Sequence, residues 1–400
     1  MLRLASERHP GCFFASTIDK SKRSNLEHGC RHLKAVRRSL FTAGRGVLAM
    51  AMLACIALAP VIGRASHDDK PIPVDIWEPP FNSERLRVRR NYVPLAHASK
   101  PWRVCASIPH LKDDYWMAVN FALIQEATRL GVRLDVFEAG GYEYLPTQRR
   151  QIADCVSRGA QAVILGAISA KGLNDLIAGY ADRNIPVVDL INGVSSPAVA
   201  ARVGADFYDM GLAAGNYLKT VTGRTDKPVR VAWFPGPTGA GWVAVGDQGF
   251  RDAVKGTNIT IVETRFGDTG IDEQTRLVSA ILDRHKDIDY IVGTAVTAEA
   301  AVQVLRGRRL SERIKVIAYY FGSSVHRGIR RHAIVAAPTD QPGLQTKLAV
   351  DVVVRILEKK DYPKHLSAPV LLVDGTSVAR FDVDSSLAPP GFRRIFSTTN

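Results

Sequence analysis

The chain lacks the residue groupings on which most catalytic and metal sites depend. Its ten histidines are scattered, without the short spacings that zinc ligation needs. The sequence contains no Gly-x-Ser-x-Gly motif, the turn that exposes a serine nucleophile at the end of a sheet strand. The glycine-rich residues 236–241 lack the Lys-Ser/Thr pair that ends a phosphate-binding loop, so they predict only a tight turn before a helix. We therefore expect a binding protein and not an enzyme, with no metal site and no cofactor.

The excess of basic over acidic residues beyond the N-terminal region is also small. The net charge is +14, but residues 1–45 carry ten basic and three acidic side chains, and Arg64 adds one more positive charge. That leaves +6 on residues 66–400, where no dense basic run with interleaved aromatic residues occurs. Because nucleic-acid binding requires a clustered basic surface, we expect no nucleic-acid partner.

Only one long apolar run is present, at residues 46–62. Arg37 and Arg38 precede it and Gly63-Arg64-Ala65 follows it, the order of a secretory signal. The alternative is a membrane anchor, but a run of this length interrupted by Pro60 is at the short limit for a membrane span. We therefore predict that residues 1–65 form a signal peptide with a long basic extension. The mature chain then starts near Ser66 and is not stably inserted in a membrane.

Cysteine is scarce, and only Cys105 and Cys155 follow the signal segment. An even number of cysteines in an exported chain makes a disulfide plausible. If the first three strands take the order 2-1-3, the helix after the second strand crosses the first strand and places Cys155 above Cys105. The alternative is two separate buried thiols.

From Trp102 onward, strands alternate with helices of 10–17 residues, the pattern of parallel sheets built from crossover units. The run is repeated after residue 205, which predicts an α/β protein of two lobes, each a parallel sheet flanked by helices, joined by hinge crossovers. Residues 66–101 are rich in proline and charge and predict an extended arm without a core of its own. We assign 102–205 with about 341–363 to the N-terminal lobe, and 206–340 with about 364–385 to the C-terminal lobe.

Aromatic residues gather where the predicted strands end: Tyr115, Trp116, Tyr142, Phe207, Tyr208, Trp242, Tyr319 and Tyr320. The carboxyl ends of parallel strands form the usual ligand crevice. Aromatic faces attract quaternary ammonium groups, and tyrosine and tryptophan can donate hydrogen bonds to an anionic oxygen. An amine oxide has both features. Asp113 and Asp340 could lie near the cationic end of such a ligand, or could instead cap a helix and support a hinge.

Several segments together resemble the TorT family of periplasmic sensor proteins, within the ribose-type class of solute-binding proteins: residues 105–116, 138–142, 202–204, 293–295, 298–301 and 389–393. The resemblance runs from about residue 102 to residue 396. It implies a type I periplasmic-binding-protein fold and a location in the periplasm. It also implies binding of trimethylamine N-oxide (TMAO), and signalling through the periplasmic domain of a TorS-type sensor histidine kinase that induces TMAO respiration.

Carried over by motif, Tyr115 and Trp116 match the family's cleft aromatics after the first strand, and Tyr142 matches its aromatic after the second strand. Tyr320 matches a tyrosine that closes a strand of the second lobe. Phe207 stands where relatives tend to carry tryptophan, so it keeps a ring face but loses an N–H donor, which bears on affinity and ligand identity. Where sugar binders carry a clamping arginine before Gly249, this chain has Val245 and Asp247, which argues against a sugar. The alternative function is the solute-binding component of an importer for a sugar or another small amine.

Overall fold

The computed structural model describes residues 71–223 and 227–398. These residues belong to one compact unit. The predicted signal segment, 1–65, lies outside the described residues. Within the described part of the chain, no helix combines the length and the apolar character needed to cross a membrane.

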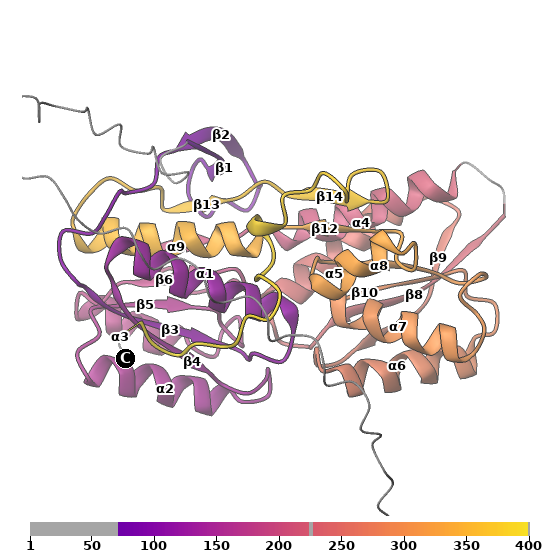
Figure 1. Cartoon of the computed structure of the whole chain (residues 1–400), viewed down its shortest axis with the longest axis horizontal. Helices are drawn as coiled ribbons and strands as arrows, with labels where there is room; N and C mark the ends of the chain where they lie inside the picture. Colours follow the sequence, from indigo (N-terminus) through magenta and orange to yellow (C-terminus); the bar gives the residue numbers. More distant parts are fainter. Residues whose placement is uncertain (1–70, 224–226, 399–400) are drawn as a thin grey trace, which may run out of the picture. The chain divides into compact units, whose positions relative to one another are not determined.

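The N-terminal lobe contains an eight-stranded sheet covered on both faces (Figure 1). Helices α1 (Asp114–Leu130) and α9 (Pro342–Leu357) cover one face, and α2 (Leu145–Ser157) and α3 (Asn174–Asp182) cover the other. Its strands, in spatial order, are β2 (Arg87–Tyr92), β1 (Ile72–Trp77), β13 (His365–Ser367), β7 (Ala201–Val203), β6 (Val187–Leu190), β5 (Ala162–Leu165), β3 (Arg103–Ile108) and β4 (Arg133–Glu138).

Side chains of β3 alternate between the two faces of this sheet, as a strand requires. Val104, Ala106 and Ile108 pack in the cluster that includes α1, whereas Cys105 packs against α2. The order β4-β3-β5 is the predicted 2-1-3 order. Accordingly α2 crosses β3, and a disulfide joins Cys105 to Cys155 with their Cα atoms 6.3 Å apart.

The C-terminal lobe contains a four-stranded parallel sheet in the order β11 (Lys315–Ala318), β10 (Tyr290–Gly293), β8 (Val229–Gly236), β9 (Ile259–Phe266). A short antiparallel pair, β12 (Ala336–Thr339) and β14 (Leu371–Asp374), lies beside it, and η2 (Val383–Ser385) is a 3-10 turn near the chain end. The helices of this lobe are α4 (Phe207–Thr222), α5 (Gly241–Val254), α6 (Ile271–Arg284), α7 (Ala295–Gly307) and α8 (Ser323–Arg330). The two lobes of parallel sheet flanked by helices confirm the predicted fold class.

The chain passes between the lobes at four places: after β7, after β12, between β13 and β14, and again after β14, because Ser397 forms a β-bridge with Asp135 of β4. The third crossing corrects the predicted lobe boundary near residue 364. β13 pairs with β7 and β1 in the N-terminal sheet, whereas β14 pairs with β12 in the C-terminal lobe. Residues 365–367 therefore belong to the N-terminal lobe.

The arm also differs from the prediction, because residues 72–92 extend the sheet as the antiparallel hairpin β1–β2. Val74 and Trp77 are buried, and the Trp77 ring stacks on His365 with 4.0 Å between ring centroids. The partner strand β13 is remote in sequence and only three residues long. Local composition therefore could not reveal the pairing.

Candidate functional site

A pocket with about 260 Å³ of empty space lies between the two lobes at the carboxyl ends of the parallel strands. Its lining residues come from both lobes: Asp113, Tyr115, Trp116, Tyr142 and Asn192 from the N-terminal lobe, and Phe207, Trp242, Thr269 and Tyr320 from the C-terminal lobe.

Tyr115 and Trp116 belong to the first turn of helix α1, and Asp113 is the N-cap residue of this helix. The Asp113 carboxylate accepts a hydrogen bond from the backbone N–H of Trp116 at 3.0 Å, the standard N-cap arrangement. The rings of Tyr115 and Trp116 then meet edge to face, 5.8 Å apart. A Cβ atom at Gly166 would lie 2.7 Å from the Trp116 ring, so only glycine leaves room for the indole there.

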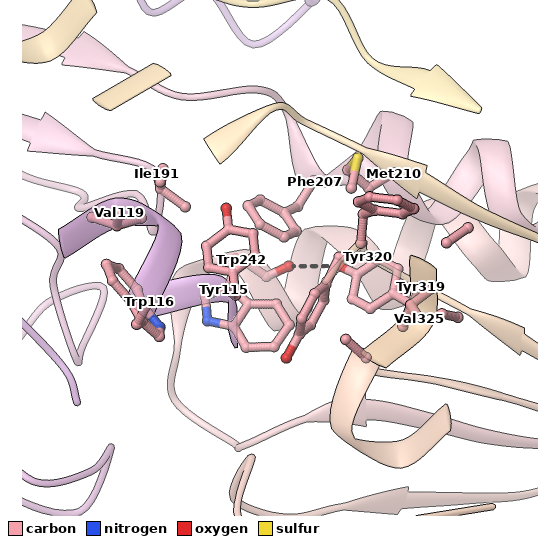
Figure 2. Close-up of a cluster of buried hydrophobic side chains, with 14 of the residues drawn as sticks. Tyr115, Trp116, Val119, Ile191, Phe207, Met210, Trp242, Tyr319, Tyr320 and Val325 are labelled. Atoms are coloured by element: carbon pink, nitrogen blue, oxygen red, sulfur yellow. Dashed lines mark hydrogen bonds between the residues drawn. The ribbon is translucent and has the colours of Figure 1, made fainter. Parts of the chain in front are cut away.

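Rings of the C-terminal lobe face this pair, and Figure 2 shows the two sets pointing toward each other. Trp242, on the first turn of α5, lies 5.4 Å from Phe207 and 6.0 Å from Tyr320 between ring centroids. Tyr320 in turn packs edge to face on Tyr115 at 5.3 Å, which closes the set across the lobe boundary. Gly236 has a φ of +120° and a Cβ there would lie 2.4 Å from the Trp242 ring, so a second glycine makes room for a second indole.

Tyr142 supplies a hydroxyl group to the cavity. Its oxygen accepts hydrogen bonds from Asn192 Nδ2 and from Trp242 Nε1, each at 3.2 Å. The described residues provide no acceptor for the hydroxyl hydrogen. Burial raises the pKa of Tyr142 above its usual value, so the group stays protonated. It can therefore donate a hydrogen bond to an oxygen atom of a ligand.

The carboxylate of Asp113 is the one charged group among the described lining residues. Burial raises its pKa. Beside it, His110 is buried and its Nε2 lies 3.0 Å from Thr269 Oγ1, which links the two lobes. Burial lowers the pKa of His110, which favours a neutral imidazole. A cation placed beside Asp113 would therefore stabilise the ionised form of its carboxyl group.

Asp340 does not line the cavity but lies behind Tyr115. Its Oδ2 accepts from the Tyr115 hydroxyl at 2.6 Å and from Gln345 Nε2 at 2.7 Å, and its Oδ1 is buried without a partner. Burial raises the pKa of this carboxyl to about 6. Its observed contacts are those of hinge support, one of the two roles predicted for it, and they orient the Tyr115 ring.

The cavity contains six of the seven predicted ligand-binding residues: Asp113, Tyr115, Trp116, Tyr142, Phe207 and Tyr320. Of the other aromatic positions, Trp242 also lines it, Tyr319 is buried behind Trp242, and Tyr208 points away toward Asp252. Asn192 and Thr269 were not anticipated. Each is a short polar residue after a strand, and the only signal that could have found them is that position.

The chain is similar to known periplasmic proteins over most of its length. Residues 104–361 match the family model described as a periplasmic binding protein domain. The periplasmic protein TorT of Escherichia coli K12 is 38% identical over 299 residues, which cover 75% of this chain and 85% of the relative, and its O157:H7 counterpart gives the same values.

Solved structures agree with this assignment. An ABC transporter solute-binding protein from Bradyrhizobium sp. BTAi1, solved with bound Bis-Tris, is 45% identical with a TM-score of 0.72, covering 82% of this chain and 98% of that one. TorT in complex with the TorS sensor domain in the presence of TMAO is 32% identical with a TM-score of 0.68, covering 74% and 99%. These similarities confirm the family resemblance and the periplasmic location, and the protein belongs to the TorT family of periplasmic binding proteins.

Proposed function

We propose that this protein senses TMAO in the aromatic cavity and signals through a TorS-type sensor histidine kinase, inducing TMAO respiration. The observation that carries the proposal is the set of aromatic rings closed across the lobe boundary by the Tyr115–Tyr320 contact. The relative TorT has been solved with the TorS sensor domain both with TMAO and without ligand. Membership of the family supports the sensor kinase as the partner, and the residues of the cavity support TMAO as the ligand.

The cavity matches TMAO at both ends of the molecule. The trimethylated nitrogen is cation-like, so the ring faces and the Asp113 carboxylate attract it. The N-oxide oxygen needs donors, and Tyr142 has a hydroxyl hydrogen to give. Phe207 lacks the N–H donor that a tryptophan would bring there. Trp242 compensates, because its Nε1–H lies on the Tyr142 hydroxyl and orients it.

Binding is expected to close the lobes. A ligand that touches rings of both lobes interacts better with the closed arrangement than with an open one, and this difference shifts the population toward closure. The sensor domain of the kinase then binds differently to the closed and the open arrangement of the lobes. The site is expected to bind its ligand without chemical turnover, as a periplasmic binding protein domain does.

A second candidate is the solute-binding component of an importer for a small amine. The Bradyrhizobium protein favours it, because Bis-Tris is a tertiary amine that carries hydroxyl groups. The same rings and the same carboxylate could receive such an amine. A sugar ligand has less support, since the solved relatives bound to sugars are below 25% identical and indicate only the fold.

Isothermal titration calorimetry of the protein purified from the periplasm distinguishes these functions. TMAO, Bis-Tris and ribose are titrated separately. We expect saturable one-site binding of TMAO that is tighter than that of Bis-Tris, and no heat with ribose. Binding of Bis-Tris or ribose without binding of TMAO would reject the sensor proposal.

A further inference from the structure

The segment that carries Tyr115 and Trp116 also reaches across to the opposite lobe. Lys112 Nζ lies 2.7 Å from Asp268 Oδ2, and the Asp114 carboxylate accepts from the backbone N–H of Ser324 at 3.0 Å. Lys112 and Asp114 flank Asp113 in the N-terminal lobe, whereas both partners belong to the C-terminal lobe. Neither Lys112 nor Asp114 lines the cavity.

The contact of Asp114 completes a helix that cannot cap itself. α8 begins after Gly322, which has no side chain to accept from the first backbone N–H groups. The Asp114 carboxylate takes that place from the other lobe, where the positive end of the helix favours a negative charge. A Cβ at Gly322 would lie 3.6 Å from the Asp114 Cβ, so the two backbones approach closely.

Both C-terminal-lobe partners lie close in sequence to residues that line the cavity. Asp268 directly precedes the lining residue Thr269, and α8 starts three residues after Tyr320. On the other side, Asp114 directly precedes Tyr115. Separation of the lobes would therefore break the ion pair, the helix cap and the Tyr115–Tyr320 ring contact together. The Lys112 and Asp268 side chains are 36% and 26% exposed, so water can replace their contact at small cost.

We propose that Lys112 and Asp114 form an interlobe latch that sets the closed fraction of the protein, and with it the ligand affinity, without touching the ligand. The inference rests on the proposed function only in naming TMAO as the ligand. The closed fraction itself can be measured without any ligand. Affinity is weakened by the factor by which the closed state becomes less populated.

The test compares wild type with Lys112→Met, Asp114→Ala and the double variant. Small-angle X-ray scattering of the ligand-free proteins gives the radius of gyration, and calorimetry gives the TMAO affinity. We expect a larger ligand-free radius, and an affinity weaker by about threefold for Lys112→Met and about tenfold for the double variant, given typical strengths of exposed ion pairs and helix caps. Increasing ionic strength should weaken binding by wild type more than by Lys112→Met, because salt screens the ion pair and TMAO has no net charge.

Arg149→Met is the matched control, since Arg149 pairs with Asp175 at 2.6 Å within one lobe. It should leave the radius, the affinity and the salt dependence unchanged. Latch variants with wild-type radius would overturn the proposal, as would an effect equal to that of Arg149→Met. If the radius changes while TMAO gives no heat in any variant, the latch stands and the ligand assignment fails.

Discussion

The two lobes build their halves of the cavity in different ways. The N-terminal lobe concentrates three lining residues in four consecutive positions, Asp113 to Trp116, and adds Tyr142 from the loop after β4 and Asn192 from the loop after β6. The C-terminal lobe takes Phe207, Trp242, Thr269 and Tyr320 from four separate places along the chain. The position of the N-terminal-lobe rings depends mainly on the start of one helix, α1. The position of the C-terminal-lobe rings depends on the fold of the whole lobe. Substitutions should therefore have larger effects on binding in the first half than in the second.

Trp116→Ala should have the largest effect on ligand binding. The substitution removes a buried ring that faces both Tyr115 and the cavity. Loss of such an anchor typically costs about 2 kcal/mol or more, so we expect TMAO affinity to fall about thirtyfold. Calorimetry measures this change, and the thermal unfolding transition should remain cooperative. Unchanged affinity would remove Trp116 from the site.

Gly166→Ala disturbs the same half without changing any lining residue. The added Cβ would lie 2.7 Å from the Trp116 ring, which must then move out of position. Displacing one well-packed anchor should weaken TMAO binding about tenfold. Gly179→Ala is the matched control, because a Cβ at that helical position meets nothing within 4 Å. Equal affinities in the two variants would contradict the proposed packing of Trp116.

Asp340→Asn examines the hinge behind Tyr115, between the two halves. The pKa of Asp340 is raised to about 6 by burial, so the folded state binds the proton more tightly than the unfolded state does. Its contribution to stability is then fully present at low pH and is lost as the pH rises through about 6. Between pH 7 and pH 5, protonation should add about 1 kcal/mol to the free energy of unfolding.

Urea unfolding at both pH values measures this difference in wild type and in Asp340→Asn. Burial lowers the pKa of His365 to about 3, which destabilises the fold at low pH in both proteins and cancels in the comparison. An equal pH dependence in the two proteins would show that Asp340 does not titrate in this range.

Trp242→Phe should have the smallest effect. It keeps a ring beside Phe207 but removes the Nε1–H donated to the Tyr142 hydroxyl. Loss of one neutral hydrogen bond corresponds to about threefold weaker TMAO binding, as measured by calorimetry. A loss larger than that of Trp116→Ala would reverse the ranking of the two halves.

The contrast between contiguous and dispersed residues also explains which features the sequence could predict. Strand and helix alternation revealed both lobes, because parallel crossover units are local patterns. Asp113, Tyr115 and Trp116 could be assigned to the site because they follow a buried strand directly. Each large aromatic residue at a strand end was also visible, although Tyr208 turned out to point away toward Asp252.

Features that depend on distant pairing could not be read in this way. The β1–β2 hairpin joins the sheet through β13, and no local pattern identifies that partner. Asn192 and Thr269 have small polar side chains without a periodic signal. Two roles were predicted for Asp340, contact with the ligand or support of a hinge, and the sequence could not decide between them; the tertiary fold places its carboxylate under the Tyr115 hydroxyl. The chain does pass between the lobes at this point, from β12 to α9.

A crystal structure of the protein grown with saturating TMAO tests the central claim most directly. The account predicts density for one TMAO molecule enclosed by Trp116, Tyr142 and Tyr320, with its oxygen within hydrogen-bonding distance of the Tyr142 hydroxyl. An empty cavity at saturation, or TMAO bound away from these rings, would contradict it.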